Sequence, residues 1–583
     1  MIEVKPYKPK NKVRIVTAAS LFDGHDAAIN IMRRIIQSSG CEVIHLGHDR
    51  SVKEIVDCAI EEDANAIALT SYQGGHNEFL KYMYDLLKEN SSEHIKIFAG
   101  GGGTILPEEI KELEDYGITK IYHPDDGRKM GLQGMINDLV LKSDYSLGDK
   151  LIGEIKDIEN QKIKSVSRAI SAVENFPNNH KEFIKTITQK AKNKEVPILG
   201  ITGTGGAGKS SLVDELVRRF LNQYENIKIG IISVDPSKRK TGGALLGDRI
   251  RMNSINSNRV YMRSLATRQA NLALSKHVSK ALEILKVANF DLIILETSGI
   301  GQSDTEITEH SSLSAYVMTP EYGAATQLEK IDMLDFADII AINKFDKKGS
   351  FDAVKDVKKQ YQRNNKLFTD KVDNMPVYGT IASQFNDPGT NTFFYELNSI
   401  LLKKGFGKFE LKSLSRSNSE SEKIYVIPPK RVRYLSEIAD SNRDYDKWVN
   451  DQSEIAKKLY ALKISMELLQ KDSEAYNQIQ LQYESYREKL TKENYNNLLG
   501  WDNLVEKYKK DIFEFDVRDK KIQIQTKFHS LSNSKISKVA LPKFESWGDI
   551  LKWLLQENVP GSFPFTSGIF PFKRQGEDPT RMF

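Results

Sequence analysis

The sequence predicts an α/β fold class, in which two doubly wound parallel sheets precede a largely helical region. Apolar runs alternate with amphipathic helical segments over residues 1–148, as in a doubly wound sheet. Another apolar run, 196–201, leads through the glycine loop 203–210 into a helix, the order that is typical of a phosphate-binding loop. Beyond residue 445, Leu, Ile and Tyr recur at helical spacing.

Composition excludes several classes of protein. Lys and Arg number 84 against 79 Asp and Glu, and no basic block stands out, so nucleic acid is not an expected partner. No apolar run approaches the roughly 20 residues that a membrane helix needs. The two cysteines, Cys41 and Cys58, suit a reducing compartment better than a disulfide scaffold. We therefore expect a cytoplasmic protein of several domains without a membrane partner.

In the first segment, residues 1–148, predicted strands and helices alternate. A parallel sheet built in this way binds its ligands at the carboxyl ends of the strands. The expected strands are 13–19, 41–46, 66–70 and 95–99, and the expected helices are 27–36, 51–62 and 79–89. The following residues, 149–195, are charged and carry Ile and Val at helical spacing, which predicts a linker of amphipathic helices packed on a neighbouring domain.

The loop after the first predicted strand holds Asp23, Gly24 and His25. It resembles the Asp-x-His-x-x-Gly loop in the cobalamin-binding domains of adenosylcobalamin-dependent mutases. This resemblance implies that His25 is the lower axial ligand of cobalt and that Asp23 bonds the far ring nitrogen, which orients the imidazole. The sequence departs from the motif at Ala28, which stands in place of glycine. A histidine in a loop without this context is more often a surface residue.

Two further positions in this segment fit the same resemblance. Ser71 lies where the family uses a serine to contact the displaced base of the cofactor. The glycine run 100–103 suits the close approach of the nucleotide tail, because glycine has no side chain. The implied cofactor-binding residues are Asp23, Gly24, His25, Ser71, Gly100, Gly101 and Gly102.

The glycine loop predicts a nucleotide site. Its backbone N–H groups surround phosphate oxygens, while Lys209 reaches the outer phosphates and Ser210 holds Mg²⁺. Glu296 follows the apolar run 291–295, and an acidic residue at such a strand end can bind Mg²⁺ directly or through water. The expected phosphate-binding residues are Gly205, Gly206, Ala207, Gly208, Lys209 and Ser210.

A third motif specifies the base. Asn343, Lys344 and Asp346 follow the apolar run 337–342 and form the Asn-Lys-x-Asp motif of GTPases. Its aspartate accepts hydrogen bonds from guanine that adenine cannot donate, so the site discriminates strongly between the two bases. Residues 380–383 stand where GTPases have their last base-contacting loop. The three motifs in this order predict GTP as the ligand, with ATP as the weaker alternative.

The nucleotide domain, 196–415, resembles the GTPase chaperones of cobalamin-dependent mutases, most specifically over residues 234–252. The loops 236–248 and 299–310 are candidate switches that the γ-phosphate orders. Gln302 is the one candidate for positioning water, and we expect slow intrinsic turnover. The implied Mg²⁺ ligands are Ser210, Asp235, Asp248, Glu296 and Thr297; Arg251 reaches a phosphate, and Lys209 and Glu296 are the catalytic residues.

The last part of the chain predicts a helical linker region, 416–530, and then the start of another domain, 531–583. The aromatic tail resembles the entrance of the TIM barrel of acyl-CoA mutases, where such residues line the acyl-CoA channel. Phe583 stands where methylmalonyl-CoA mutase has a tyrosine that contacts the substrate carboxylate, so its phenyl ring suits an uncharged acyl group. A shift of the alignment by one residue, or a core role for Phe583, is the alternative. The implied substrate residues are Phe570, Phe572, Arg581 and Phe583.

The order of these domains is that of the fused isobutyryl-CoA mutase family. The resemblance implies a GTPase that chaperones cofactor loading and a radical interconversion of isobutyryl-CoA and n-butyryl-CoA, with adenosylcobalamin, GTP and Mg²⁺ as cofactors. It also implies an acyl-CoA substrate and a homodimer at full length. A barrel takes roughly 250 residues, so we expect only its first segment in this chain.

Three alternatives stay open: a separate chaperone subunit, an enzyme of the methylmalonyl-CoA mutase type, and a G protein whose first domain binds another ligand. The expected domains are a flavodoxin-like cobalamin domain (1–148), a helical linker (149–195), a GTPase domain (196–415), a helical linker region (416–530) and the start of a mutase domain (531–583).

Overall fold

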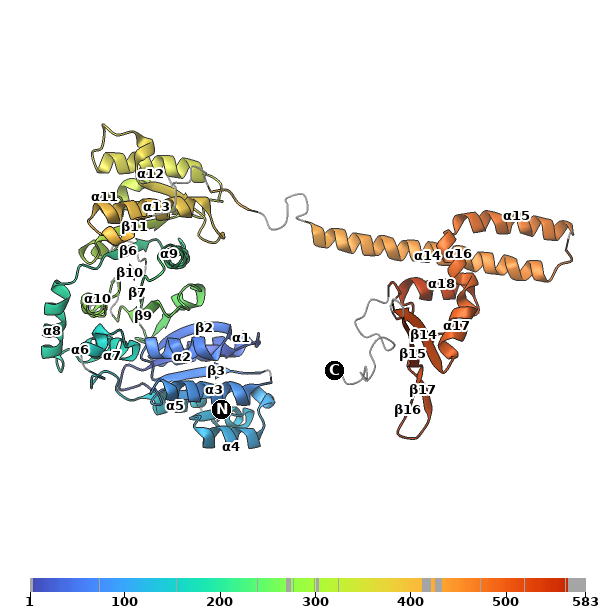
Figure 1. Cartoon of the computed structure of the whole chain (residues 1–583), viewed down its shortest axis with the longest axis horizontal. Coiled ribbons are helices and arrows are strands. Elements are labelled where there is room, and N and C mark those ends of the chain that lie inside the picture. Colours follow the sequence, from blue (N-terminus) through green and yellow to red (C-terminus); the bar gives the residue numbers. More distant parts are fainter. Residues whose placement is uncertain are drawn as a thin grey trace. The chain divides into compact units, whose positions relative to one another are not determined.

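The computed structural model divides into two compact units, Met1–Ile424 and Tyr425–Phe583 (Figure 1). Among the described residues, no helix combines the length and apolar character that crossing a membrane requires. The structure describes residues 4–72, 74–153, 155–238, 240–268, 274–275, 277–297, 299, 304–322, 325–411, 421–424, 433–471, 473–517, 520–560 and 562–564.

The first sheet of the N-terminal unit is parallel and six-stranded, in the order β5-β4-β3-β1-β2-β8. Helices cover both of its faces, with α1 and α5 on one and α2, α3 and α4 on the other. The elements are β1 (Arg14–Ser20), α1 (Asp26–Ser38), β2 (Glu42–Arg50), α2 (Val52–Glu61), β3 (Ala66–Thr70), α3 (His76–Glu89), β4 (Lys96–Gly100), α4 (Pro107–Tyr116), β5 (Lys120–Tyr122), α5 (Pro124–Ser143) and β8 (Ala244–Leu246).

The second sheet is parallel and seven-stranded, in the order β13-β12-β11-β6-β10-β7-β9. Two apolar clusters line its faces, one below α9 and α13 and the other below α7, α10, α11 and α12. Its elements are β6 (Ile198–Gly203), α9 (Lys209–Gln223), β7 (Ile229–Asp235), β9 (Val260–Ala266), α10 (Val278–Val287), β10 (Leu292–Glu296), β11 (Leu313–Met318), α11 (Met333–Phe336), β12 (Ile339–Asn343), α12 (Ser350–Asn364), β13 (Val377–Thr380) and α13 (Pro388–Lys403).

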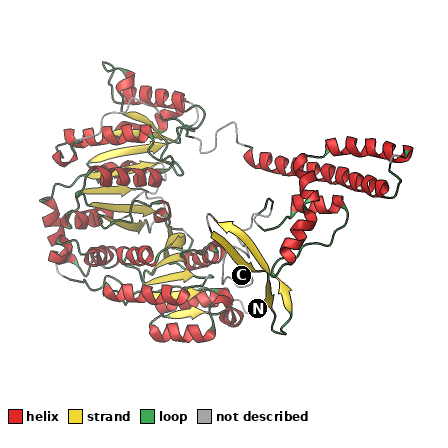
Figure 2. Cartoon of the chain, turned by 45° about the vertical axis from the view of Figure 1, so that its right-hand side comes forward, coloured by secondary structure: helices red, strands yellow, loops and turns green. Residues whose placement is uncertain are grey.

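The predicted fold class is confirmed: strands stack in layers with helices on either side, as Figure 2 shows in yellow and red. Residues 149–195 contain the helices α6 (Ile155–Glu159), α7 (Ile163–Asn175) and α8 (Lys181–Lys192). Helix α7 is buried along most of its length, including Val166, Ile170 and Val173.

Strand β8 is among the strands that were not predicted from the sequence. Strand β8 comes from within the nucleotide segment, yet it pairs in parallel with β2 of the first sheet, with Ala244 opposite Glu42 and Leu246 opposite Ile44. Gly243 allows this approach, because a Cβ there would lie 2.1 Å from the carbonyl oxygen of Gln37. The two sheets are therefore joined through backbone hydrogen bonds as well as side chains.

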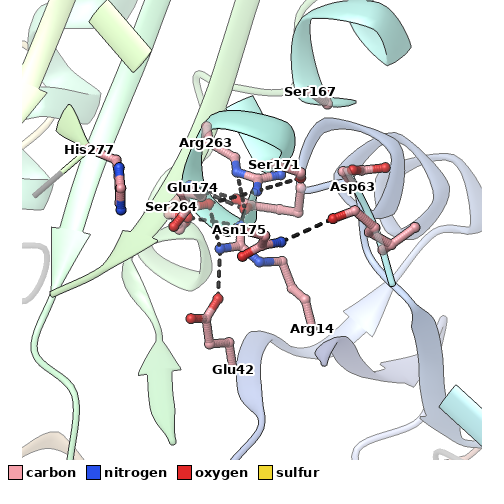
Figure 3. A network of polar contacts seen from close by, with 12 residues as sticks. Arg14, Glu42, Asp63, Ser167, Ser171, Glu174, Asn175, Arg263, Ser264 and His277 are labelled. Atoms are coloured by element: carbon pink, nitrogen blue, oxygen red, sulfur yellow. Dashed lines mark hydrogen bonds and ion pairs between the residues drawn. The ribbon is translucent and has the colours of Figure 1, made fainter. Parts of the chain in front are cut away.

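A buried polar network connects the first sheet, α7 and the second sheet (Figure 3). Arg14 of β1 forms ion pairs with Glu42 at 2.7 Å and with Glu62 at 2.9 Å. Glu174 at the end of α7 lies 3.1 Å from Arg263 of β9. Because breaking one partner of a buried pair leaves an uncompensated charge, such a network fixes the three elements against one another.

The C-terminal unit has a helical core, where helical spacing predicted helices, and two small antiparallel sheets that the sequence analysis did not predict. Leu459, Trp501 and Leu551 lie in its core. The elements are α14 (Tyr434–Glu467), α15 (Glu474–Lys489), α16 (Lys492–Leu499), α17 (Trp501–Lys509), β14 (Ile512–Val517), β15 (Lys520–Gln525), β16 (Lys527–His529), β17 (Lys535–Ser537) and α18 (Trp547–Gln556).

Candidate functional site

The predicted phosphate-binding loop lies between β6 and α9. Gly206 and Gly208 have φ angles of 76° and 90°, in the left-handed region that glycine adopts without strain. Lys209 opens α9, and its Nζ donates a hydrogen bond to the carbonyl oxygen of Gly203 at 3.1 Å. The loop glycine Gly205 and the buried Ala207 complete the turn. The backbone of this loop is thus shaped for an anion at the N-terminus of a long helix.

The predicted Mg²⁺ ligands Ser210, Asp248 and Glu296 come together beside this loop. The Ser210 hydroxyl donates to Glu296 Oε1 at 2.8 Å, and in an alternative bond to Asp248 Oδ1 at 3.0 Å. Ser233 also bonds the Asp248 carboxylate. Arg251, the predicted phosphate contact, is exposed at the end of the short helix η2 (Asp248–Arg251).

Two carboxylate oxygens of this cluster have no hydrogen-bond partner within the described part of the chain, although they are buried: Asp235 Oδ2 and Glu296 Oε2. Burial and then the nearby charge of Asp248 raise the pKa of both carboxyls well above its usual value. Among the described residues, no group of three His, Cys, Asp or Glu side chains could hold a metal ion alone. A divalent cation here therefore needs oxygens from Ser210, phosphate or water, which is how Mg²⁺ binds with a nucleotide.

Thr297, another predicted Mg²⁺ ligand, bonds to a threonine of β6. Its hydroxyl shares a hydrogen bond of 2.7 Å with the hydroxyl of Thr202, and the side chain is buried. Gln302 and part of the second candidate switch lie outside the described residues.

The base motif is tied to the phosphate loop by Asn343. Its Nδ2 donates to the carbonyl oxygen of Ala207 at 2.7 Å, and its Oδ1 accepts from the amide of Ala382 at 3.0 Å. Asn343 thereby holds the phosphate loop and the predicted base-contacting loop together. Lys344 has a φ of 59°, and the Asp346 side chain is one-quarter exposed.

The predicted cobalt ligand lies at the carboxyl edge of the first sheet. His25 has a side chain that is 65% exposed, and its Nδ1 lies 2.8 Å from Oδ1 of the fully buried Asp23. The amides of His25 and Tyr72 donate to the same carboxylate at 2.9 and 2.7 Å. Burial opposes ionisation of Asp23, but these amides and the imidazole together hold the pKa of its carboxyl below the usual value. The carboxylate therefore orients the ring and leaves Nε2 for a ligand.

An apolar cavity of about 260 Å³ lies beside this loop, lined by residues of α1, β3, β4 and α5. Gly100, Gly101 and Gly102 form part of its wall. A Cβ at Gly101 would lie 2.0 Å from the carbonyl oxygen of Ser71, whereas nothing lies within 4 Å of one at Gly24. The glycine run thus permits a close backbone contact at the rim of a largely apolar cavity.

Sequence reasoning missed Tyr72 in this site. Its backbone amide fixes Asp23, and its ring lies 5.6 Å from that of His25. Position Ser71 was predicted, and its hydroxyl accepts a hydrogen bond from Ser20 at 3.1 Å. The predicted substrate residues Phe570, Phe572, Arg581 and Phe583 lie outside the described residues.

Comparisons with known proteins agree with this arrangement. Residues 13–123 match the family described as "B12 binding domain", and residues 166–386 match "Methylmalonyl Co-A mutase-associated GTPase MeaB". The B12 binding domain indicates cobalamin, and the GTPase domain implies GTP with Mg²⁺.

Three curated relatives, each named fused isobutyryl-CoA mutase, match 99% of the chain. They come from Geobacillus kaustophilus (53% identical, 54% of its length), Cupriavidus metallidurans (50%, 53%) and Nocardia farcinica (44%, 53%). The chain spans about half the length of the curated relatives it matches. It thus carries a B12 binding domain and a MeaB-type GTPase domain, and over nearly its whole length it is similar to the fused isobutyryl-CoA mutases.

Proposed function

We propose that this chain supplies the cobalamin-binding and GTPase parts of a fused isobutyryl-CoA mutase, and that its GTPase site controls the loading of adenosylcobalamin. The observation that carries the proposal is the exposed imidazole of His25, held through Nδ1 by the buried Asp23 beside an apolar cavity. The similarity to fused isobutyryl-CoA mutases over nearly the whole chain supports it.

In this proposal, His25 binds cobalt through Nε2, and Asp23 keeps the ring in the tautomer that allows this. The cavity and the backbone of Gly100, Gly101 and Gly102 accept the nucleotide tail of the cofactor, with Ser71 and Gly24 beside it. When bound, adenosylcobalamin supplies the radical chemistry of the rearrangement. The residues of this chain bind and orient it.

At the second site, the charge of Lys209 offsets that of the GTP phosphates, and the loop amides donate hydrogen bonds to them. Ser210 holds Mg²⁺. Asp235 Oδ2 and Glu296 Oε2 have no hydrogen-bond partner among the residues that the structure describes, which supports a cation near them, because a divalent charge offsets the cost of burying the two carboxyls together. Asp248 is the third carboxylate near this cation, and Arg251 contacts a phosphate. Asp346 accepts hydrogen bonds from guanine.

The proposal extends to the whole protein. We propose that it interconverts isobutyryl-CoA and n-butyryl-CoA, works as a homodimer in the cytoplasm, and uses Phe570, Phe572, Arg581 and Phe583 toward the acyl-CoA. We also propose the five-domain division with boundaries at 148, 195, 415 and 530.

Absorbance spectroscopy tests the central claim. On titration of the chain with adenosylcobalamin, we expect the cofactor to lose its own base and take histidine as its lower ligand. His25→Ala should abolish that spectral change, while His529→Ala, at an exposed histidine of the C-terminal unit, should leave it intact. GDP binding in the same samples reports that the variants are folded. A wild-type chain that leaves the cofactor spectrum unchanged overturns the cobalamin assignment.

A further inference from the structure

A four-residue segment, 421–424, lies against the loops that surround the predicted base site. Ser421 is buried, accepts a hydrogen bond from the amide of Gly389 at 3.1 Å, and donates to Asp387 Oδ2 at 3.0 Å. The same Asp387 oxygen accepts from the amide of Ile381, in the loop that follows β13. Ser421 thus anchors the segment, through one shared carboxylate, to the loop predicted to contact the base.

Gln384 fixes the next three residues of the segment. Its Nε2 donates to the carbonyl oxygen of Glu422, and its Oε1 accepts from the amide of Ile424, both at 2.8 Å. A side-chain amide that bonds the backbone on both sides of one residue defines the position of that residue, which here is Lys423. The backbone on both sides of Lys423 is therefore held by bonds that do not involve the charge of its side chain.

Lys423 Nζ lies 3.4 Å from Oδ2 of Asp346. Asp346 is the carboxylate that, under the proposed function, accepts hydrogen bonds from guanine. The lysine side chain is 51% exposed and the aspartate 25% exposed, so their attraction is weak and solvent can replace it. The Lys423 ammonium group and the guanine base both donate to the Asp346 carboxylate, so they compete for it.

We propose that Lys423 is a further determinant of guanine-nucleotide affinity: it pairs with the Asp346 carboxylate and must be displaced when the base binds. This inference rests on the proposed guanine role of Asp346. By thermodynamic reciprocity, whatever weakens the Lys423–Asp346 contact favours nucleotide binding, and nucleotide binding releases Lys423 from the loop.

The test measures binding of a fluorescent GDP analogue to the full chain and to Lys423→Ala at low ionic strength. Removal of a cation near a polyanionic ligand ordinarily weakens binding, so the expected result, about 1.5- to 5-fold tighter binding, has the opposite sign to a general charge effect. The gain should shrink as salt is added. Lys347→Ala is the matched control, because Lys347 directly follows Asp346 in the sequence but pairs with Glu321 at 2.7 Å. This control should not tighten binding.

A double-variant comparison identifies the carboxylate. In Asp346→Asn, assayed with a xanthosine diphosphate analogue, the neutral amide attracts no lysine, so Lys423→Ala should have no effect. Lys423→Ala binding that is weaker than wild type, or equal to Lys347→Ala, overturns the inference while leaving the guanine assignment in place. A wild-type chain that does not bind GDP overturns both.

Discussion

Arg249 donates a hydrogen bond from Nε to Oε1 of Glu62 at 2.9 Å, and both side chains are almost fully buried. Glu62 follows helix α2, which packs on the first sheet, whereas Arg249 directly follows Asp248, a carboxylate of the predicted nucleotide site. The guanidinium also bonds Glu61 through Nη2 at 2.7 Å. A residue adjacent to the predicted Mg²⁺ site is thus held by the domain that carries His25.

Arg249→Met should open this contact. Loss of the cation leaves Glu62 buried without one of its main charge partners, which costs about 3–5 kcal/mol of folding free energy. Hydrogen exchange should therefore speed up in residues 244–249 and in β2, which β8 covers. Arg128→Met is the control, because Arg128 is 80% exposed in its pair with Asp125, and it should cost under about 1 kcal/mol. Equal exchange in the two variants contradicts this account.

Gly101→Ala should weaken cobalamin binding without affecting GDP. The added Cβ would meet the backbone oxygen of Ser71 at 2.0 Å, so the rim of the cavity must shift. Gly103→Ala is a matched control, since nothing lies within 4 Å of its Cβ. We expect at least about a tenfold loss of affinity for the first variant and little for the second, measured by cofactor absorbance. Similar affinities for both would show that the glycine run does not shape the cofactor site.

Asp346→Asn should change base preference. The amide cannot accept the two hydrogen bonds that guanine offers, so GTP binding should weaken by about 2–3 kcal/mol, or roughly 30- to 150-fold. Xanthosine triphosphate, which presents an acceptor in place of the amine, should become a substrate. Turnover of both nucleotides by wild type and variant is the measurement. An unaltered rate with GTP contradicts the base assignment.

His94 should make the stability of the N-terminal unit depend on pH. Burial, and then the charge of Arg168, lower the pKa of His94 to about 4, against an ordinary value of 6.5. Arg168 Nη2 lies 3.2 Å from His94 Nε2, so the neutral ring accepts its hydrogen bond and a protonated ring cannot. The folded state thus binds this proton less readily than the unfolded state.

The neutral His94 ring therefore contributes to the stability of the folded state above pH 6.5, and this contribution is lost as the pH falls toward 4. Since the ring is partly exposed, about 1–2 kcal/mol is expected. Asp63, whose carboxyl has a lowered pKa and pairs with Arg168, loses its contribution only at lower pH. His94→Gln keeps an acceptor without a titrating group, so urea unfolding at pH 7 and pH 5 should differ less than in wild type. An equal difference in both proteins argues against His94 as the source.

Much of the fold could be predicted because its signals are local. The strand–loop–helix order around Lys209 lies within about 25 residues, and the alternation of apolar runs with amphipathic segments sufficed for the confirmed fold class. The predicted strands at 13–19 and 66–70 agree with β1 and β3 within one residue at every end. His25 and Asp23, two residues apart, could also be paired from sequence.

The features that sequence could not provide depend on distant partners. Arg14 lies in an apolar strand, and its burial makes sense only with Glu42 and Glu62, which other elements supply. Lys423 reaches Asp346 from beyond α13 through a short segment without regular structure. No period in the sequence marks either contact, because each depends on tertiary packing.

Strand β8 has a consequence for how this polypeptide can be divided. A fragment that stops before Ala244 would leave β2 with a bare rim of amide and carbonyl groups, and such rims recruit foreign strands and promote aggregation. During synthesis, β2 leaves the ribosome long before β8, so this edge of β2 stays unpaired until β8 has been made. The first sheet therefore gains its last strand only after part of the nucleotide domain has been made.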